Sequence, residues 1–121
     1  MKNDSVSLLK NKDVLIVPLN PNMNDQELKQ FELRVLQETS KEDTIRSVVI
    51  DVSSFESMDL FAAKLLFGMV KKLEMMDIKS VMVGIRPEVA ITLMDIGIEF
   101  PDVITAPSLE RGLRLLKRSK K

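Results

Sequence analysis

The fold is decided by residues 47–76, which read SVVIDVSSFESMDLFAAKLLFGMVKKLEMM. The first six of these residues are nearly all apolar and mostly β-branched, which is typical of a strand buried in a parallel sheet. A polar loop follows at 53–57, and from Met58 to Met76 apolar residues recur at helical spacing. The stretch therefore predicts a strand, a loop and a helix that returns the chain to a neighbouring parallel strand.

Elements of the same kinds are predicted on both sides of this stretch. Two short apolar runs flank a polar step, Asn11 to Asp13, that is typical of a hairpin turn. Asn24 followed by Glu27 resembles a capping box at a helix start. Gly97 is a natural helix stop, and Ser108 is a natural N-cap. The predicted strands cover 6–9, 14–17, 47–52, 80–85 and 103–105, and the predicted helices begin near 24, 58, 86 and 108.

The predicted order is β-β-α-β-α-β-α-β-α, which defines an α/β fold. Alternation of strands and helices implies right-handed crossovers and a mainly parallel sheet, and the opening hairpin adds one antiparallel edge strand. Four helices flank this sheet. No repeat or linker divides residues 1–121, so we expect a single domain that ends in a basic tail at 117–121.

The composition excludes many kinds of enzyme. The 121 residues include 18 Lys and Arg, 18 Asp and Glu, and no His or Cys. Without thiolates or imidazoles, the usual zinc, haem and iron–sulfur sites and the His-dependent nucleophile systems are ruled out. The four glycines form neither a P-loop nor a dinucleotide-binding motif. We therefore expect a non-enzymatic protein with no cofactor.

The same sequence features limit the partners and the compartment. Asp51, Glu56 and Asp59 would be carboxylate ligands for a divalent cation, but their spacing matches no metal loop, and Asp59 is better explained as a helix cap. The balanced charge argues against a nucleic-acid partner. The longest apolar run is too short to cross a membrane, and the N-terminus lacks a signal-peptide pattern. We expect a soluble, cytoplasmic protein with no metal site.

The helix predicted at 58–76 carries apolar residues on two sides. At 100° per residue, one side forms a core stripe. Its members are Met58, Ala62, Leu65, Leu66, Met69, Leu73 and Met76. The opposite side groups Leu60, Ala63, Lys64, Phe67 and Lys71. Apolar residues bordered by lysines are typical of an exposed docking patch, and a second helix of the same domain covering this side is the alternative.

The loop and helix start also carry a family resemblance. Residues 49–59, VIDVSSFESMD, resemble the signature of the STAS domain, a family of anti-sigma-factor antagonists and cytoplasmic domains of sulfate transporters. Residues 84–90, GIRPEVA, with the segment that follows, are similar to the STAS subunits of the bacterial stressosome. The resemblance implies a scaffold or antagonist that binds a serine/threonine kinase of the anti-sigma type or assembles with other STAS subunits into homo- or hetero-oligomers.

The resemblance also implies a regulatory position that this sequence lacks. In the family, the loop ends in an Asp followed by a phosphorylatable Ser or Thr. Asp59 matches that Asp, but the next residue is Leu60, which cannot accept a phosphate. Of the nearby serines, Ser53, Ser54 and Ser57, only Ser57 is a credible substitute. We hypothesise that the usual switch is lost and that Leu60 belongs to a permanently binding-competent surface.

An alternative function uses two loops. In open α/β sheets, binding sites gather beyond the carboxyl ends of the strands, which here means Ser53–Asp59 and Gly84–Glu88. A small-ligand or anion-sensing STAS module would use both, with Arg86 as an anion contact and Glu88 beside it. The competing interpretation of Arg86 is a surface residue at a helix start.

Overall fold

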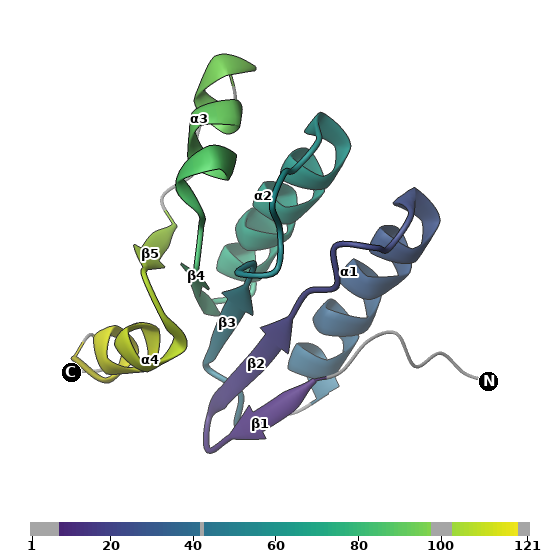
Figure 1. Cartoon of the computed structure of the whole chain (residues 1–121). Helices are drawn as coiled ribbons and strands as arrows, with labels where there is room; N and C mark the ends of the chain where they lie inside the picture. The colour runs from purple at the N-terminus through teal and green to yellow at the C-terminus, as the bar shows by residue number, and fades with distance from the viewer. Residues whose placement is uncertain (1–7, 42, 98–102, 119–121) are drawn as a thin grey trace.

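The structure is a computed structural model and describes residues 8–41, 43–97 and 103–118. It contains one sheet in the order β1-β2-β3-β4-β5, with β1 antiparallel to β2 and the other neighbours parallel (Figure 1). The predicted order and α/β class are confirmed. The elements are β1 (Leu9–Asn11), β2 (Val14–Pro18), α1 (Asp25–Lys41), β3 (Ser47–Asp51), α2 (Leu60–Met75), β4 (Lys79–Val83), α3 (Pro87–Asp95), β5 (Ile104–Ala106) and α4 (Leu109–Arg118).

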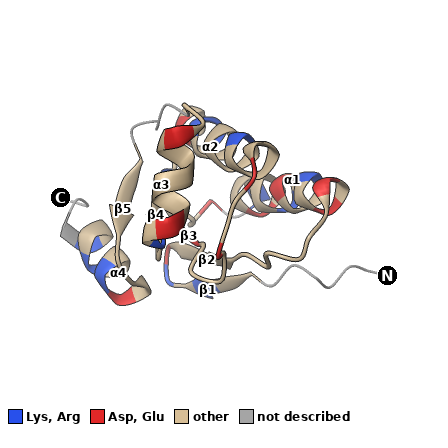
Figure 2. Ribbon diagram, turned by 45° about the horizontal axis from the view of Figure 1, so that its top comes forward, with Lys and Arg blue, Asp and Glu red and all other residues tan. Residues whose placement is uncertain are grey.

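The sheet separates two apolar cores. Strand β3 contributes to both, because alternate side chains of a strand point to opposite faces. Val48 and Ile50 belong to the larger core with residues of α1 and α2, whereas Val49 packs with Leu116 of α4 on the other face. Figure 2 shows α1 and α2 along one face and α4 on the opposite face. Burial on both faces explains why β3 is apolar almost throughout.

Local sequence signals set the helix ends as predicted. Asn24 and Glu27 form a capping box, in which each side chain accepts a hydrogen bond from the other residue's backbone N–H, at 2.8 and 2.9 Å. Ser108 Oγ accepts from the N–H of Arg111 at 3.2 Å, as an N-cap does. Gly97 follows the end of α3 with a φ of +77°, a conformation that suits glycine.

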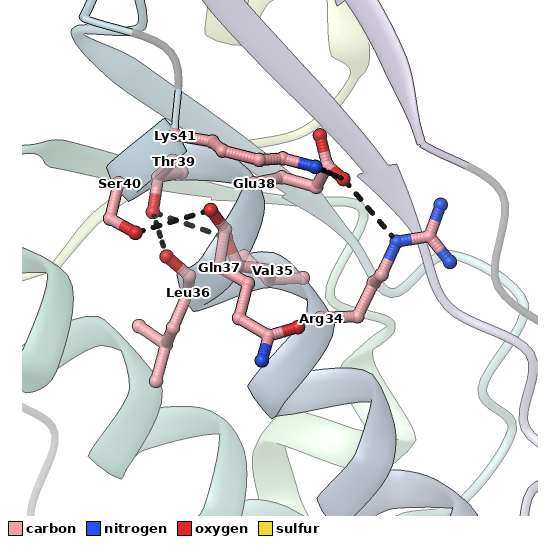
Figure 3. Close-up of polar contacts among 8 residues, drawn as sticks. All are labelled: Arg34, Val35, Leu36, Gln37, Glu38, Thr39, Ser40 and Lys41. Atoms are coloured by element: carbon pink, nitrogen blue, oxygen red, sulfur yellow. Dashed lines mark hydrogen bonds and ion pairs between the residues drawn. The ribbon is translucent and has the colours of Figure 1, made fainter.

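The C-terminal end of α1 is held by its own polar side chains (Figure 3). The buried Thr39 hydroxyl donates to the carbonyls of Val35 and Leu36 at 3.1 and 3.0 Å. The Glu38 carboxylate lies 3.6 Å from Arg34 Nε and 3.5 Å from Lys41 Nζ. These contacts satisfy the buried hydroxyl and tie the last turns together, which matters because the last carbonyls of a helix lack partners within it.

Several predicted boundaries are corrected. The strand predicted at 80–85 is β4 at Lys79–Val83, and the strand predicted at 103–105 is β5 at Ile104–Ala106. The first strand was predicted at 6–9, but β1 covers Leu9–Asn11, and residues 6 and 7 lie outside the described part. Asn11 pairs with Val14, so the turn shortens to two residues, and Lys12 adopts a φ of +59°. Helix α2 begins at Leu60 rather than Met58, because Asp59 is its N-cap. Of the predicted tail at 117–121, residues 117 and 118 belong to α4, and residues 119–121 lie outside the described part.

The predicted core stripe of α2 is right except at its end. Met76 is exposed, because α2 ends at Met75 and the next residue has left helical geometry. In the described ranges, no helix is both long and apolar enough to cross a membrane.

Candidate functional site

The two loops predicted to carry function lie side by side at the carboxyl edge of the sheet. Arg86 Nε donates a hydrogen bond to the carbonyl of Ser53 at 3.0 Å, which joins the loop after β4 to the loop after β3. The N–H of Val52 donates to the carbonyl of Val83 at 3.0 Å and extends the pairing of the two strands. The topology therefore brings both predicted loops into one region, as expected for neighbouring parallel strands.

Gly84 allows this close approach. Its φ is +81°, and a Cβ atom placed on it would lie 2.6 Å from the Cβ of Ser53. Such a separation is well inside van der Waals contact, and the positive φ is itself unfavourable for other residues. Glycine is therefore required at position 84 for two reasons. A side chain would overlap Ser53, and the backbone conformation is unfavourable for other residues.

The loop before α2 is held by two buried side chains, whereas the residues around them are exposed to solvent. Phe55 and Met58 are buried in the larger core, whereas Ser53, Ser54, Glu56 and Ser57 are exposed. Asp51 accepts a hydrogen bond from the N–H of Ser53 at 2.9 Å, which holds the start of the loop. The anchoring leaves the serine hydroxyls at the surface.

Asp59 caps α2. Its Oδ1 accepts a hydrogen bond from the N–H of Ala62 at 2.9 Å, and its backbone carbonyl accepts from the N–H of Ala63 at 3.0 Å. The expected role of Asp59 as a cap is confirmed. Asp51 and Asp59 thus each bind a backbone N–H, and the described residues contain no cluster of three metal-ligating side chains.

The second side of α2 is only partly exposed, which corrects the predicted docking patch. Leu60 is 46% exposed, and Lys64 and Lys71 are also exposed. Ala63 and Phe67, however, are buried, with Phe67 only 7% exposed. For Ala63 and Phe67 the alternative prediction, that the same domain covers this side of the helix, is right, because both residues pack into the larger core. What remains at the surface is Leu60 at the start of α2, followed on the same side by Lys64 and Lys71.

A groove runs between α2 and the end of α3. Its volume is about 430 Å³. The lining residues are Leu60, Lys64, Phe67, Gly68 and Lys71 from α2, with Ile96 and Gly97 from the end of α3. The groove has an apolar floor at Phe67 and a cationic border, so the exposed remainder of the α2 face continues onto α3.

Arg86 and Glu88, the two residues predicted from the second loop, have different roles in the structure. Arg86 is half-buried and uses its Nε–H to hold the Ser53 carbonyl, so it positions the neighbouring loop. Glu88 is exposed in the first turn of α3, where an acidic side chain favours the helix dipole. The hydrogen bond to Ser53 gives Arg86 a structural task, and its role as an anion contact stays a prediction.

Comparison with known proteins identifies the family. A model of the STAS domain matches residues 5–111. The chain belongs to the STAS domain family. Two solved structures resemble this STAS domain at 31% sequence identity. One is a variant of RsbS from Moorella thermoacetica, with a TM-score of 0.85 over 95% of this chain and 97% of that chain. The other comes from the molecular architecture of the stressosome, with a TM-score of 0.82 over 93% and 96%.

A sequence relative of this STAS domain is considerably longer. The RsbT co-antagonist protein RsbRB of Bacillus subtilis (strain 168) is 26% identical over 102 residues, which are 84% of this chain and 36% of RsbRB. The chain therefore spans about a third of the length of that relative. The likeness to stressosome proteins confirms the predicted branch of the family.

Sequence reasoning missed one exposed surface of this STAS domain. On α3, Ile91 and Met94 are 62% and 65% exposed. The buried residues of α3 are Val89 and Leu93, and a helical wheel places Ile91 opposite them. The signal was therefore present in the sequence, but the predicted sites followed α2 and stopped at Glu88.

Proposed function

We propose that this STAS domain is a non-enzymatic protein-binding scaffold that binds a serine/threonine kinase of the anti-sigma type or other STAS subunits in the cytoplasm. The observation that carries the proposal is the likeness to RsbS and to the stressosome chain over nearly the whole length of this chain. The exposed loop serines and Leu60 then supply a surface at the carboxyl edge of the sheet, where a partner can dock. The pathway is of the partner-switching, stressosome-like kind.

The second part of the proposal concerns the missing switch. Leu60 is the first residue of α2 and directly follows the N-cap Asp59. In the family pattern a phosphorylatable residue occupies this place, and a phosphate there would add about −1.5 to −2 charges beside the positive end of a helix dipole. Leucine accepts no phosphate, so the docking surface stays in its unphosphorylated, binding-competent form.

Ser57 is a poor replacement for the missing acceptor. It is exposed, but it belongs to the loop and precedes the N-cap by two residues. It lines a hollow of about 190 Å³ together with Asp25 and Asp59. A phosphate on Ser57 would share this hollow with two carboxylates, and like charges repel. We therefore expect Ser57 to remain unmodified.

Phosphorylation in vitro tests the missing switch. The chain is incubated with a serine/threonine kinase of the anti-sigma type and ATP, and intact mass is measured. We expect no phosphate on the natural sequence and incorporation into Leu60→Ser, which restores a hydroxyl at the start of α2. Stoichiometric phosphate that disappears in Ser57→Ala would overturn the claim of a lost switch.

Substitution of Leu60 tests the docking surface. Leu60→Asp should weaken binding to the kinase or STAS partner about tenfold or more, because a charge replaces an apolar contact. Folding should be preserved, because Leu60 is 46% exposed and an acid is favourable in the first turn of a helix. Leu33→Asp is the matched control, since Leu33 is 55% exposed on α1. Equal binding by both variants would remove Leu60 from the interface.

A further inference from the structure

A hollow of about 370 Å³ lies at the amino ends of β2 and β3, at the opposite edge of the sheet from the loops after β3 and β4. Its apolar lining consists of Val14, Leu113 and Leu116. Helix α4 packs against β3, β4 and β5, and Figure 1 shows it on the β5 side of the sheet. Strand β2 is therefore incompletely covered on this face, and Val14 is only half-buried. This amino-edge hollow has the volume of a small-molecule site and an apolar surface on which a ligand can lie.

Ser47 brings a buried hydroxyl to the amino-edge hollow. The residue is 6% exposed and lies two positions before Val49, so both side chains point to the α4 face of the sheet. Within the described residues, the Ser47 hydroxyl has no hydrogen-bond partner. The hydroxyl of Ser80 also lacks a described partner, but it is enclosed, whereas Ser47 lines the open hollow. Because buried polar groups are nearly always paired, the Ser47 hydroxyl requires a partner in the hollow.

The charged side chains around the amino-edge hollow favour an anion. Lys12, Arg114 and Lys117 line it together with Asp13 and Glu110. The carboxylate of Glu110 lies 3.2 Å from Nη2 of Arg114 and is engaged by it. Among the described residues, Lys12 and Lys117 form no ion pair. The sequence after α4, Ser-Lys-Lys at 119–121, adds two cations and no acidic side chain, so this end of the chain carries an excess of positive charge.

A neighbouring hollow lacks this excess of positive charge. Its volume is about 630 Å³, and it shares Ser47 with the amino-edge hollow. Its charged lining residues are Arg46, Glu74, Asp77 and Lys79. Two cations and two carboxylates balance each other, so an anion should prefer the amino-edge hollow.

We propose that the amino-edge hollow binds a small aliphatic carboxylate, with Lys12, Lys117 and the Ser47 hydroxyl around its head and its chain on Val14 and Leu113. A carboxylate accepts hydrogen bonds from ammonium groups and from a hydroxyl at the same time, which matches these three donors. The site lies at the other edge of the sheet from the protein-binding surface proposed at the start of α2. The inference therefore adds a ligand to the proposed function and does not depend on it.

Titration with sodium octanoate tests the proposal. Methyl and amide NMR spectra of the full chain locate the site, and isothermal titration calorimetry gives the affinity. We expect saturable binding that shifts the signals of Val14, Ser47 and Leu113. Acetate, which lacks the chain, and octanol, which lacks the charge, should bind about tenfold more weakly or worse. The absence of a saturable shift with octanoate, or equal binding of octanol, would overturn the proposal.

Two double variants with the same change in net charge separate the site from a general effect of charge. Lys12→Gln with Lys117→Gln should weaken octanoate binding about tenfold or more, because the head loses both ammonium groups. Arg46→Gln with Lys79→Gln removes two cations from the neighbouring hollow and is the matched control, so its affinity should change less than about twofold. Equal losses in the two double variants would contradict the assigned site.

Ser47→Ala tests the buried hydroxyl. The variant should fold normally, because it removes a hydroxyl that has no described partner, and it should bind octanoate about three- to tenfold more weakly. Circular dichroism checks the fold. Natural affinity in a folded Ser47→Ala variant would contradict a head group at Ser47.

Vesicles of dioleoylphosphatidylglycerol distinguish a free carboxylate from an anionic membrane. We expect the chain not to sediment with these vesicles, because the hollow admits single ligand chains beside α4 and presents no broad apolar surface. Sedimentation with the vesicles in the absence of any octanoate binding would assign the basic end of α4 to a membrane and overturn the proposal.

Discussion

Gly84 shows how much of the site depends on a single residue. The loop after β4 approaches the loop after β3 so closely that a methyl group at this position would overlap Ser53. The same loop contributes the Arg86 hydrogen bond to the Ser53 carbonyl. The hydrogen on Gly84 therefore sets the spacing of the surface from which Ser54, Ser57 and Leu60 are presented.

Alanine substitution of two glycines separates crowding from backbone strain. Gly84 and Gly97 both have positive φ, of +81° and +77°, but among the described residues only Gly84 has a neighbour within reach of an added Cβ. We expect Gly97→Ala to lower the free energy of unfolding by about 1 kcal/mol through its backbone conformation. Gly84→Ala should lower it by about 3 kcal/mol, because overpacking adds to the strain. Urea denaturation measures both, and equal losses would show that crowding at Ser53 is unimportant.

At the scale of elements, α2 and α4 use glycine in opposite ways. Gly112 brings α4 close to the sheet, since an added Cβ would lie 2.7 Å from Val83 Cγ1 and 2.9 Å from Val81 Cγ1. Gly68 lies in the middle of α2 at the groove, and an added Cβ would meet no atom of the described residues within 4 Å. The glycine of α4 therefore serves packing, whereas that of α2 leaves the groove open.

The same substitution should have opposite signs in the two helices. Gly68→Ala should raise the free energy of unfolding by about 0.5–1 kcal/mol, because alanine is the better helix former and has room here. Gly112→Ala should lower it by about 1–3 kcal/mol, because the new methyl group pushes α4 away from β4. Thermal unfolding followed by circular dichroism gives both values. Stabilisation by Gly112→Ala would contradict the close approach of α4.

At the scale of the whole molecule, the sheet couples two cores that share no side chain. Ile50 and Val49 are adjacent in β3, yet one packs beneath α1 and α2 and the other beneath α4. Both are fully buried. Any loosening of β3 therefore reaches both cores, and we expect the described elements to unfold together.

Truncating either side chain should reveal this coupling. Ile50→Ala should lower the free energy of unfolding by about 2–5 kcal/mol through the cavity it leaves, and Val49→Ala should also be destabilising. In both variants, methyl NMR signals from α2 and α4 should disappear at the same urea concentration as the far-UV circular dichroism signal. Separate transitions for the two faces would contradict a single cooperative unit.

Much of the fold was predictable because its signals are local. The capping box at Asn24 and Glu27 and the cap at Asp59 involve hydrogen bonds between residues three apart. The apolar content of 47–52 is enough to indicate a strand buried on both faces. The predicted bounds of β1 were less accurate. The end of β1 depends on the pairing of Asn11 with Val14, which is a contact between two strands, and neither of the two apolar runs indicates it by itself.

The candidate site was predictable only in part. Both loops and the cap were found, since parallel neighbouring strands must present their ends at one edge. The docking patch was half wrong, because Phe67 and Ala63 are apolar whether a core or a partner covers them. Ile91 and Met94 were missed because an exposed apolar residue has the same kind of side chain as an apolar residue that a core covers.

The sequence by itself determined the order of elements, the caps and the absence of a residue that accepts phosphate after Asp59. These depend on periodicity, on hydrogen bonds within a turn and on the chemistry of single side chains. Only the tertiary structure decided that Ser53 meets Gly84 and Arg86, that Phe67 is covered and that Ile91 is exposed. Periodicity shows which faces of an element are apolar, but burial depends on which distant segment packs against each face.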